Sequence, residues 1–395
     1  MTRRQATADG GTPTMDPETL YDRVERGDTV TILDVRGPDE FEEWRIDGPS
    51  VAVTNVPGTE FEGGLDEGLL ADIPRGDPLV VVCAKGISSD AVAEQLRAAG
   101  RDAVNLDDGM EGWARVYRRL EVERYDRAGT FYQYQRPSSG CLSYLLVDGD
   151  EAAVVDPLRA FTDRYRADAQ ELGADLVYAF DTHIHADHFS GVRHLAAEGV
   201  TAVLPDRAID RGVDYEDEVV PATDGDEFDV GDAAIEAMHT PGHTSGMTAY
   251  LVAGQALLTG DGLFTESVAR PDLEEGDEGA ARAARLLYES LHERILPLGD
   301  DVLVAPGHAS DSAETAADGT YTRPLGELRD RMPLLSADED AFVEEILSDM
   351  PPRPGNYRSI IAANLGAELI ADEQAFQLEL GPNNCATSTD ALTSD

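Results

Sequence analysis

A dense group of potential metal ligands follows the short apolar segment at residues 176–180. Residues 181–188 read D-T-H-I-H-A-D-H and hold three of the eight histidines in the 395-residue chain. A turn held at the end of a buried strand brings such closely spaced side chains into one small volume. Imidazole and carboxylate ligands together suit zinc, iron and related divalent metals. The run therefore predicts a metal centre, and a histidine-rich surface loop is the alternative.

Three further potential ligands stand alone, each directly behind a glycine. His243 lies in T-P-G-H-T, Asp261 in L-T-G-D and His308 in A-P-G-H, and each segment follows a short apolar run. A loop held by a rigid sheet positions a ligand well, so we expect all these side chains to converge at one edge of the fold. The predicted metal ligands are His183, His185, Asp187, His188, His243, Asp261 and His308.

A cysteine in a different setting lies earlier in the chain. The sequence C-A-K-G-I-S-S begins at Cys83, directly after the apolar segment 79–82 and at the start of a predicted helix. The unpaired N–H groups and the dipole of a helix N-terminus stabilise a thiolate and bind anions. Lys85, the only lysine of the chain, adds positive charge to this loop. We expect Cys83 to be a nucleophile, and Lys85 and Gly86 to receive an anionic substrate.

Arg270 is a candidate for a second anion contact. It follows Asp261 by nine residues, so its guanidinium would meet the charged tail of a substrate bound at the metal centre. A structural ion pair is the alternative. The two remaining cysteines, Cys141 and Cys385, are predicted to be small buried hydrophobic residues.

The elements that must hold these residues form two α/β series and a tail. In the first, at residues 15–122, short apolar runs alternate with a helical pattern that ends at Gly100, which indicates a parallel sheet covered on both faces. In the second, at residues 127–320, the apolar runs lie closer together, which favours a sandwich of mixed sheets with outer helices. A predominantly helical extension follows at residues 321–386, and we expect it to act as a lid or as the contact of a homodimer.

The composition excludes two classes of partner. The chain holds 78 Asp and Glu against 31 Lys and Arg, a formal net charge of −47. Such a surface repels polyphosphate backbones and anionic membranes, so neither nucleic acid nor a membrane is expected as a partner. An acid excess with one lysine is typical of the solvated surface of a halophile. Few cysteines, no signal-like N-terminus and no window of roughly 18 to 20 apolar residues predict a cytoplasmic protein.

The first domain resembles a rhodanese domain. The segment L-D-V-R at residues 33–36, the C-x-x-G loop at Cys83 and D-D-G-M-E-G-W at residues 107–113 carry this resemblance. Rhodanese domains pass sulfane sulfur through a cysteine persulfide, so the resemblance implies this role for Cys83. This chain has Ser88 near the end of the loop, where an arginine is common. This difference affects thiosulfate binding more than persulfide formation. A catalytically silent domain used for docking is the alternative.

The second domain resembles the metallo-β-lactamase superfamily. The segments T-H-I-H-A-D-H, H-T-P-G-H-T, T-G-D and P-G-H occur in the order of that superfamily. The resemblance implies an αββα sandwich with two metal positions. It assigns His183, His185 and His243 to one position and Asp187, His188 and His308 to the other, with Asp261 bridging.

The number of bound metals separates two chemistries. Hydrolases of the superfamily use a dinuclear centre to generate a hydroxide nucleophile, whereas its persulfide dioxygenases bind one iron. Carried onto this chain, the iron ligands would be His183, His243 and Asp261. Two histidines and one carboxylate with open positions suit Fe²⁺ and O2 chemistry. The residues around the ligands leave both options open.

Together the two resemblances predict an enzyme of sulfur metabolism. A rhodanese unit joined to this metal domain is similar to fusions among persulfide dioxygenases, which implies oxidation of a small-molecule thiol persulfide with O2 to sulfite at a mononuclear Fe²⁺. Sulfane sulfur from a donor would pass through Cys83. The alternative is a dinuclear hydrolase of glyoxalase II-type thioesters, with two Zn²⁺ per chain and a vestigial rhodanese domain. A noncatalytic sulfur-binding or docking module is a third hypothesis.

Overall fold

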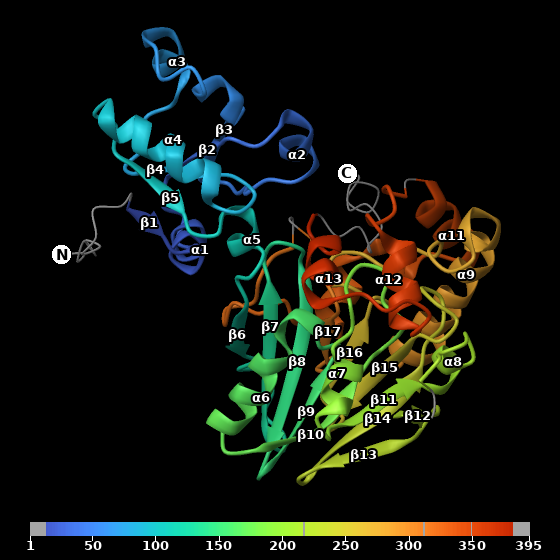
Figure 1. The fold of residues 1–395 in the computed structure, drawn as a ribbon. Helices are drawn as coiled ribbons and strands as arrows, with labels where there is room; N and C mark the ends of the chain where they lie inside the picture. The colour runs from blue at the N-terminus through green and yellow to red at the C-terminus, as the bar shows by residue number, and fades with distance from the viewer. Residues whose placement is uncertain (1–12, 216–217, 311–312, 349, 382–395) are drawn as a thin grey trace. The chain divides into compact units, whose positions relative to one another are not determined.

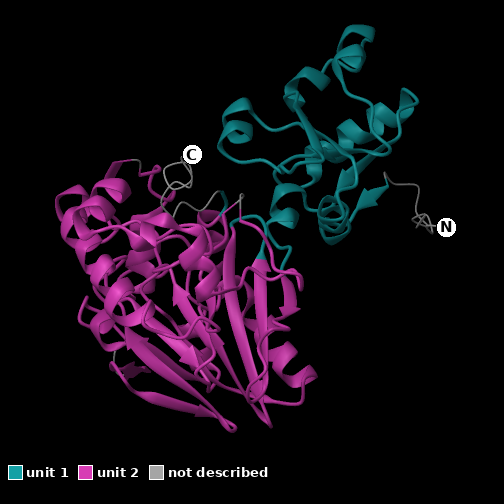
Figure 2. Ribbon diagram, turned by 180° about the vertical axis from the view of Figure 1, so that it is seen from behind, with its two compact units in different colours: residues 1–117, 136–139, 380–382 teal, residues 118–135, 140–379, 383–395 magenta. Residues whose placement is uncertain are grey.

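The chain folds into two compact units (Figures 1 and 2). The first comprises the chain up to Tyr117 with the short segments 136–139 and 380–382, and the second comprises the remainder. Cys385 and the end of the predicted extension lie outside the residues that the structure describes. The computed structural model describes residues 13–215, 218–310, 313–348 and 350–381.

A five-stranded parallel sheet forms the centre of the first unit. Its elements are β1 (Thr14–Met15), α1 (Pro17–Glu25), β2 (Val30–Asp34), α2 (Pro38–Glu43), β3 (Val51–Asn55), a 3-10 turn (Gly58–Phe61), α3 (Glu67–Asp72), β4 (Leu79–Val82), α4 (Ile87–Ala98), β5 (Ala103–Leu106) and α5 (Gly109–Trp113). The strand order is β1-β5-β4-β2-β3. Both faces are covered, because Val80 lies in one hydrophobic core with Leu20 of α1 and Val81 lies in another with Leu96 of α4. The predicted parallel α/β domain is confirmed.

Two mixed sheets form the second unit and pack face to face (Figure 1). The seven-stranded sheet consists of β6 (Arg118–Glu121), β7 (Thr130–Arg136), β8 (Cys141–Asp148), β9 (Glu151–Val155), β10 (Asp175–Phe180), β11 (Thr201–Pro205) and β12 (Val220–Ala222). The six-stranded sheet consists of β13 (Glu227–Val230), β14 (Ala233–His239), β15 (Thr248–Val252), β16 (Ala256–Gly260), β17 (Leu303–Pro306) and β18 (Arg323–Pro324). One hydrophobic core lies between them and contains Leu146 of β8 and Leu258 of β16.

Helices cover the outer faces of this sandwich. They are α6 (Thr162–Glu171), α7 (Val192–Ala197), α8 (Asp206–Ile209), α9 (Gly276–Ser290) with a π-helical turn (Leu291–Ile295), α10 (Leu325–Arg331), α11 (Glu339–Ser348), α12 (Tyr357–Asn364) and α13 (Asp372–Leu378). Leu287 of α9 and Phe342 of α11 share a core with Leu257 of β16, on the outer side of the six-stranded sheet. The predicted αββα arrangement with a helical extension is confirmed. Within the described residues, every helix is too short or too polar to cross a bilayer.

The strand at the junction of the two units belongs to the second one. Sequence analysis included residues 118–121 in the first domain, which it ended at residue 122. In the structure β6 pairs in antiparallel fashion with β7, from Arg118 opposite Gln135 to Glu121 opposite Tyr132. This pairing makes β6 the edge of the seven-stranded sheet. The domain limits 15–122, 127–320 and 321–386 stay predictions.

We expect Phe180 to contribute strongly to the stability of the sandwich. Its fully buried ring lies at the end of β10 and contacts two rings of the other sheet, Phe228 and Tyr250, with centroid distances of 5.2 and 5.0 Å. Phe180→Ala should lower the free energy of unfolding by about 3–5 kcal/mol, because it removes a packed ring and leaves a cavity. Denaturant titration followed by circular dichroism measures this change. Leu369→Ala, at a side chain that is 90% exposed, is the control and should change stability by less than about 0.5 kcal/mol.

Candidate metal centre

The predicted ligand segments meet where strands of both sheets end. Residues 181–188 follow β10, Asp261 follows β16, and His308 comes two residues after β17. Strands β16 and β17 are parallel neighbours, so their carboxyl ends lie at the same edge. A bridge between Cys141, the first residue of β8, and His308 joins this edge to the other sheet. All seven predicted ligands are buried here.

Three of the ligands form a compact triad. The ligand atoms of His183, His243 and Asp261 lie within 4.8 Å of one another. Asp261 Oδ2 is 3.9 Å from His183 Nε2 and 3.7 Å from His243 Nε2. Each of these three atoms is buried and has no hydrogen-bond partner among the described residues. Buried polar atoms without partners are costly, so three that face one another fit the ligand set of a metal ion.

Hydrogen bonds on the far side of each imidazole set its tautomer. Thr182 Oγ1 donates to Asp156 Oδ2 at 3.0 Å, so it accepts from His183 Nδ1 at 2.9 Å. His243 Nδ1 donates to the carbonyl oxygen of Arg270 at 3.0 Å. Both rings therefore present the Nε2 lone pair to the triad. Burial lowers the pKa of His243, and lowers that of His183 well below the usual imidazole value, which favours the neutral, metal-binding form.

The two carboxylate oxygens of Asp261 face different partners. Oδ1 accepts a hydrogen bond from His308 Nδ1 at 2.5 Å, while Oδ2 faces the triad. The glycines of the two ligand turns allow this close approach. A Cβ on Gly307 would stand 2.7 Å from Asp261 Oδ1, and one on Gly260, whose φ is +48°, would stand 2.5 Å from Thr182 Oγ1.

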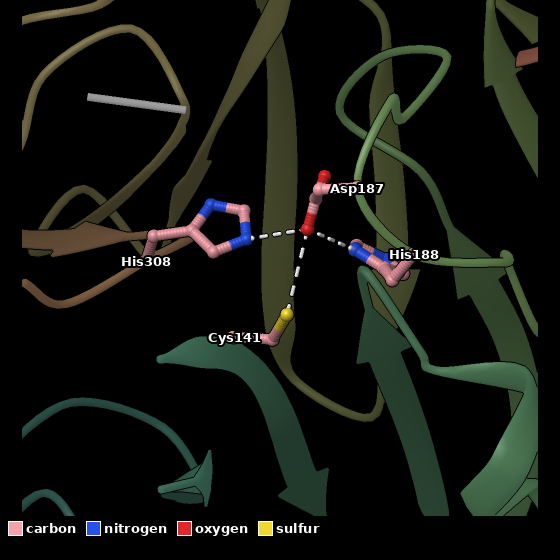
Figure 3. A group of neighbouring side chains, drawn as sticks. All are labelled: Cys141, Asp187, His188 and His308. Carbon is pink, nitrogen blue, oxygen red and sulfur yellow. Dashed lines mark hydrogen bonds and ion pairs between the residues drawn. The ribbon is translucent and has the colours of Figure 1, made fainter. Parts of the chain in front are cut away.

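A second group of side chains gathers around Asp187 (Figure 3). Asp187 Oδ2 lies 2.9 Å from His308 Nε2, 3.0 Å from His188 Nδ1 and 3.4 Å from Cys141 Sγ. The ligand atoms of all four residues lie within 4.8 Å of one another. Sequence analysis treated Cys141 as a small buried hydrophobic residue. It is buried, but its sulfur lies among potential metal ligands.

His185 contacts a third group through one nitrogen of its ring, while the other nitrogen, Nδ1, is buried and has no hydrogen-bond partner among the described residues. Its Nε2 lies 3.1 Å from Asp156 Oδ1 and 3.7 Å from Asp181 Oδ1. Asp156 is not among the ligands predicted from the sequence, although a carboxylate directly after the buried strand β9 indicates a possible ligand. The structure thus brings the seven predicted ligands together in adjoining groups, and their division between two metal positions stays a prediction.

The helical extension holds the backbone of the ligand loop. Asn364, at the end of α12, donates from Nδ2 to the carbonyl oxygens of His185 at 3.0 Å and His188 at 2.9 Å. Its Oδ1 accepts from the backbone N–H of Ser190 at 3.0 Å. Glu379 accepts from the N–H of Phe189 at 2.7 Å. No local pattern marks Asn364 in the sequence, because its partners lie far away along the chain.

Arg270 does not present its guanidinium to the centre. The side chain is only 1% exposed, and Nε and Nη2 bond to the two carboxylate oxygens of Asp272 at 2.7 and 3.1 Å. The same group donates to the carbonyl oxygens of Pro351 and Pro352. The structure therefore corrects the expected substrate contact to the alternative, a structural ion pair. Arg270 serves the centre through its backbone carbonyl, which orients His243.

The Cys83 loop of the first unit has its own geometry. Ser89 Oγ donates to Cys83 Sγ at 3.1 Å, and Gly86 precedes α4 with a φ of +74°. Burial raises the pKa of Cys83, but hydrogen bonds from the hydroxyls of Ser88 and Ser89 and from backbone N–H groups outweigh it, so the pKa lies below the ordinary thiol value. Ser88, the departure from the rhodanese pattern, thus stabilises the thiolate.

Lys85 is half exposed and forms an ion pair near the same loop. Its Nζ lies 3.1 Å from Glu111 Oε1, and its side chain is 53% exposed. The pairing reduces the positive charge that the loop offers to an anion. The roles of Lys85 and Gly86 in substrate binding stay predictions.

Comparisons with known proteins agree with this division of the chain. Residues 137–308 match the model of the metallo-beta-lactamase superfamily, and residues 16–116 match that of the rhodanese-like domain. The mitochondrial persulfide dioxygenase ETHE1 of Bos taurus is 30% identical over 238 residues, which cover 59% of this chain and 86% of that protein. A hydroxyacylglutathione hydrolase of Francisella philomiragia is 30% identical over 194 residues, covering 48% and 68%.

A solved structure supports the same relationship. The crystal structure of ETHE1 from Myxococcus xanthus superposes with a TM-score of 0.51 at 28% identity, covering 60% of this chain and 98% of that one. The buried histidine and aspartate groups occur within a fold that these relatives share. The chain therefore belongs to the metallo-beta-lactamase superfamily, is homologous to the persulfide dioxygenases, and carries a rhodanese-like domain in addition.

Proposed function

We propose that this protein oxidises a small-molecule thiol persulfide with O2 to sulfite at one Fe²⁺ held by His183, His243 and Asp261. The triad carries this proposal, because each of its members directs one buried, otherwise unpartnered atom toward the other two. Two imidazoles and one carboxylate leave positions open around a metal, as in non-haem Fe²⁺ oxygenases. The homology to persulfide dioxygenases supports the same substrate class.

Iron bound in the triad would supply open coordination positions for the persulfide sulfur and for O2. The chain itself maintains the geometry. Thr182 and the Arg270 carbonyl hold the two imidazoles, and His308 holds Asp261. Overall, persulfide, O2 and water yield thiol, sulfite and protons, with the outer sulfur oxidised and O2 reduced. Burial of the triad keeps bulk water away from the reacting sulfur.

Cys83 would exchange sulfane sulfur with the small thiol that carries the persulfide. Its thiolate attacks the outer sulfur of a donor, the donor's sulfur–sulfur bond breaks, and Cys83 holds the sulfur as a persulfide. Attack by the acceptor thiolate then releases Cys83. The hydrogen bonds of Ser88 and Ser89 to Sγ support this role, since the thiolate is both the nucleophile and the leaving group.

A dinuclear zinc thioesterase is the second candidate. The Asp187 group next to the triad favours it, because it offers ligands for a further metal. The homology to a hydroxyacylglutathione hydrolase supports it as well. In this reading the metals would activate a water molecule for attack on a thioester.

Metal content and O2 uptake distinguish the two candidates. Protein purified without air should hold about one iron per chain in the triad, and should consume O2 when given glutathione persulfide. His243→Ala should lose the iron and reduce O2 uptake to the background, because a facial triad cannot form from two ligands. His194→Ala, which changes a partly exposed histidine of α7, is the matched control and should retain both. Iron-loaded protein that consumes no O2, or zinc-loaded protein that hydrolyses an acyl-glutathione thioester, would contradict the proposal.

The reactivity of Cys83 should depend on its serine neighbours. Ser89→Ala removes the hydroxyl that donates to Sγ, so the thiolate loses stabilisation and the pKa of Cys83 should rise. The alkylation rate of Cys83, followed by mass spectrometry of its peptide across pH, should then reach half of its plateau at a higher pH than in the wild type. Ser50→Ala, at a partly exposed serine of the same unit, is the control. An unchanged profile in Ser89→Ala would show that this hydroxyl does not tune the thiol.

A further inference from the structure

We propose that Glu111 sets the donor preference of Cys83. Glu111 holds the ammonium group of Lys85 in an ion pair, and the Cys83 loop therefore takes sulfane sulfur from thiol persulfides in preference to thiosulfate. This inference rests on the sulfur exchange proposed above and names the class of its donor. It concerns the first unit alone and does not depend on the metal centre.

Helix α5 is fixed against the Cys83 loop through its backbone. The N–H of Met110 donates to the carbonyl oxygen of Cys83 at 2.8 Å, and the N–H of Glu111 donates to that of Ala84 at 3.0 Å. A Cβ on Gly109 would stand 2.2 Å from the Cys83 carbonyl oxygen, so a side chain at this position would force the two segments apart. The start of α5 is thereby held next to the nucleophile.

This backbone arrangement places the Glu111 carboxylate beside Lys85. Lys85 Nζ lies 3.1 Å from Glu111 Oε1, and the Glu111 side chain is only 18% exposed, whereas Lys85 is half exposed. Water screens such a pair, so it contributes little to the stability of the fold. Its effect on an incoming anion is larger, because the pair has no net charge, while Lys85 alone would offer a positive charge that can move toward the donor.

The two segments around the thiol carry more negative than positive charge. Residues 83–89 contain a single cation, and residues 107–111 contain three carboxylates. Two of these carboxylates, those of Asp107 and Asp108, are exposed. With Lys85 paired, the charge that an anion meets at these segments is negative.

The two classes of donor differ in the charge that reaches the loop. When the Cys83 thiolate attacks the outer sulfur of thiosulfate, the sulfur–sulfur bond breaks and sulfite leaves, so the reacting groups together carry three negative charges. When it attacks a protonated thiol persulfide, the transferred sulfur keeps its proton, a thiolate leaves, and the reacting groups carry one. Repulsion therefore disfavours thiosulfate much more than a persulfide, unless a cation offsets the charge of the dianion.

An exposed apolar side chain in the loop fits an organic donor. Among the residues that the structure describes, three large apolar side chains are exposed, and one of them, Ile87, lies in this loop with an exposed fraction of 77%. Ile87 directly precedes Ser88, whose hydroxyl stabilises the Cys83 thiolate. The tail of a thiol persulfide would cover part of the Ile87 side chain, whereas thiosulfate has no apolar tail.

Loading of Cys83 in a single turnover tests the inference. The full chain is mixed with thiosulfate or with the persulfide of 2-mercaptoethanol, an uncharged thiol, and mass spectrometry follows the persulfide on the Cys83 peptide. Wild-type protein should react more slowly with thiosulfate. Glu111→Gln keeps the shape of the side chain and removes its charge. It should raise the ratio of the thiosulfate rate to the persulfide rate about tenfold, because Lys85 is then able to offset the dianion.

Two further variants separate the release of Lys85 from other effects of the substitution. In a Lys85→Gln background, Glu111→Gln should raise the same ratio less than about threefold, because only the weaker direct repulsion by the carboxylate is removed. Glu94→Gln removes an exposed carboxylate from the middle of α4. It is the matched control and should keep the wild-type ratio.

Three results would overturn the inference. They are wild-type protein that loads Cys83 from thiosulfate as fast as from the persulfide, an unchanged ratio in Glu111→Gln, and an equal rise of the ratio with and without Lys85. None of these measurements uses iron or O2. The expected shift of the ratio in a protein that consumes no O2 would therefore refute only the proposed oxidation. A Cys83 that takes sulfur from neither donor would refute the proposed exchange and this inference with it.

Discussion

The hydrogen bond from His308 to Asp261 divides the buried candidate ligands between two neighbouring groups. It uses Oδ1 of Asp261 and Nδ1 of His308. Oδ2 of Asp261 therefore faces His183 and His243, and Nε2 of His308 faces Asp187. Asp261 thereby completes a triad of three ligands, and His308 joins the group around Asp187. Because a buried polar atom without a partner is costly, this hydrogen bond favours one orientation of each of the two side chains.

Supporting contacts reach this cluster from most of the second unit. The side chain of Asp156, at the end of β9, receives hydrogen bonds from the backbone N–H and the hydroxyl of Thr182 and also contacts His185. Asn364 holds the carbonyl groups of the ligand loop from the helical extension. Metal ligands held in this way lose little conformational freedom when a metal binds. The helical extension therefore helps to position the candidate ligands, in addition to covering the sheet.

Each of the two units holds a buried cysteine beside hydrogen-bond donors. Each places a sulfur atom among hydrogen-bond donors: Cys83 beside the Ser88 and Ser89 hydroxyls, and Cys141 beside His188 and His308. The net charge of −47 makes the rest of the surface unfavourable for anions. The halophilic habit inferred from that charge stays a prediction.

The fold class, the ligand turns and the Cys83 loop could be predicted from the sequence, because they depend on periodicity and on residues that are neighbours along the chain. The pattern of an apolar strand followed by glycine and a potential ligand predicted that Asp261 and His308 would lie close to residues 181–188. Which atoms of these side chains face one another could not be predicted from the sequence. His185 Nε2 contacts Asp156, and Cys141 lies beside Asp187, because folding brings together buried polar atoms that are far apart along the chain. Arg270 pairs with Asp272, two residues further on, because its guanidinium is buried and needs a counter-charge.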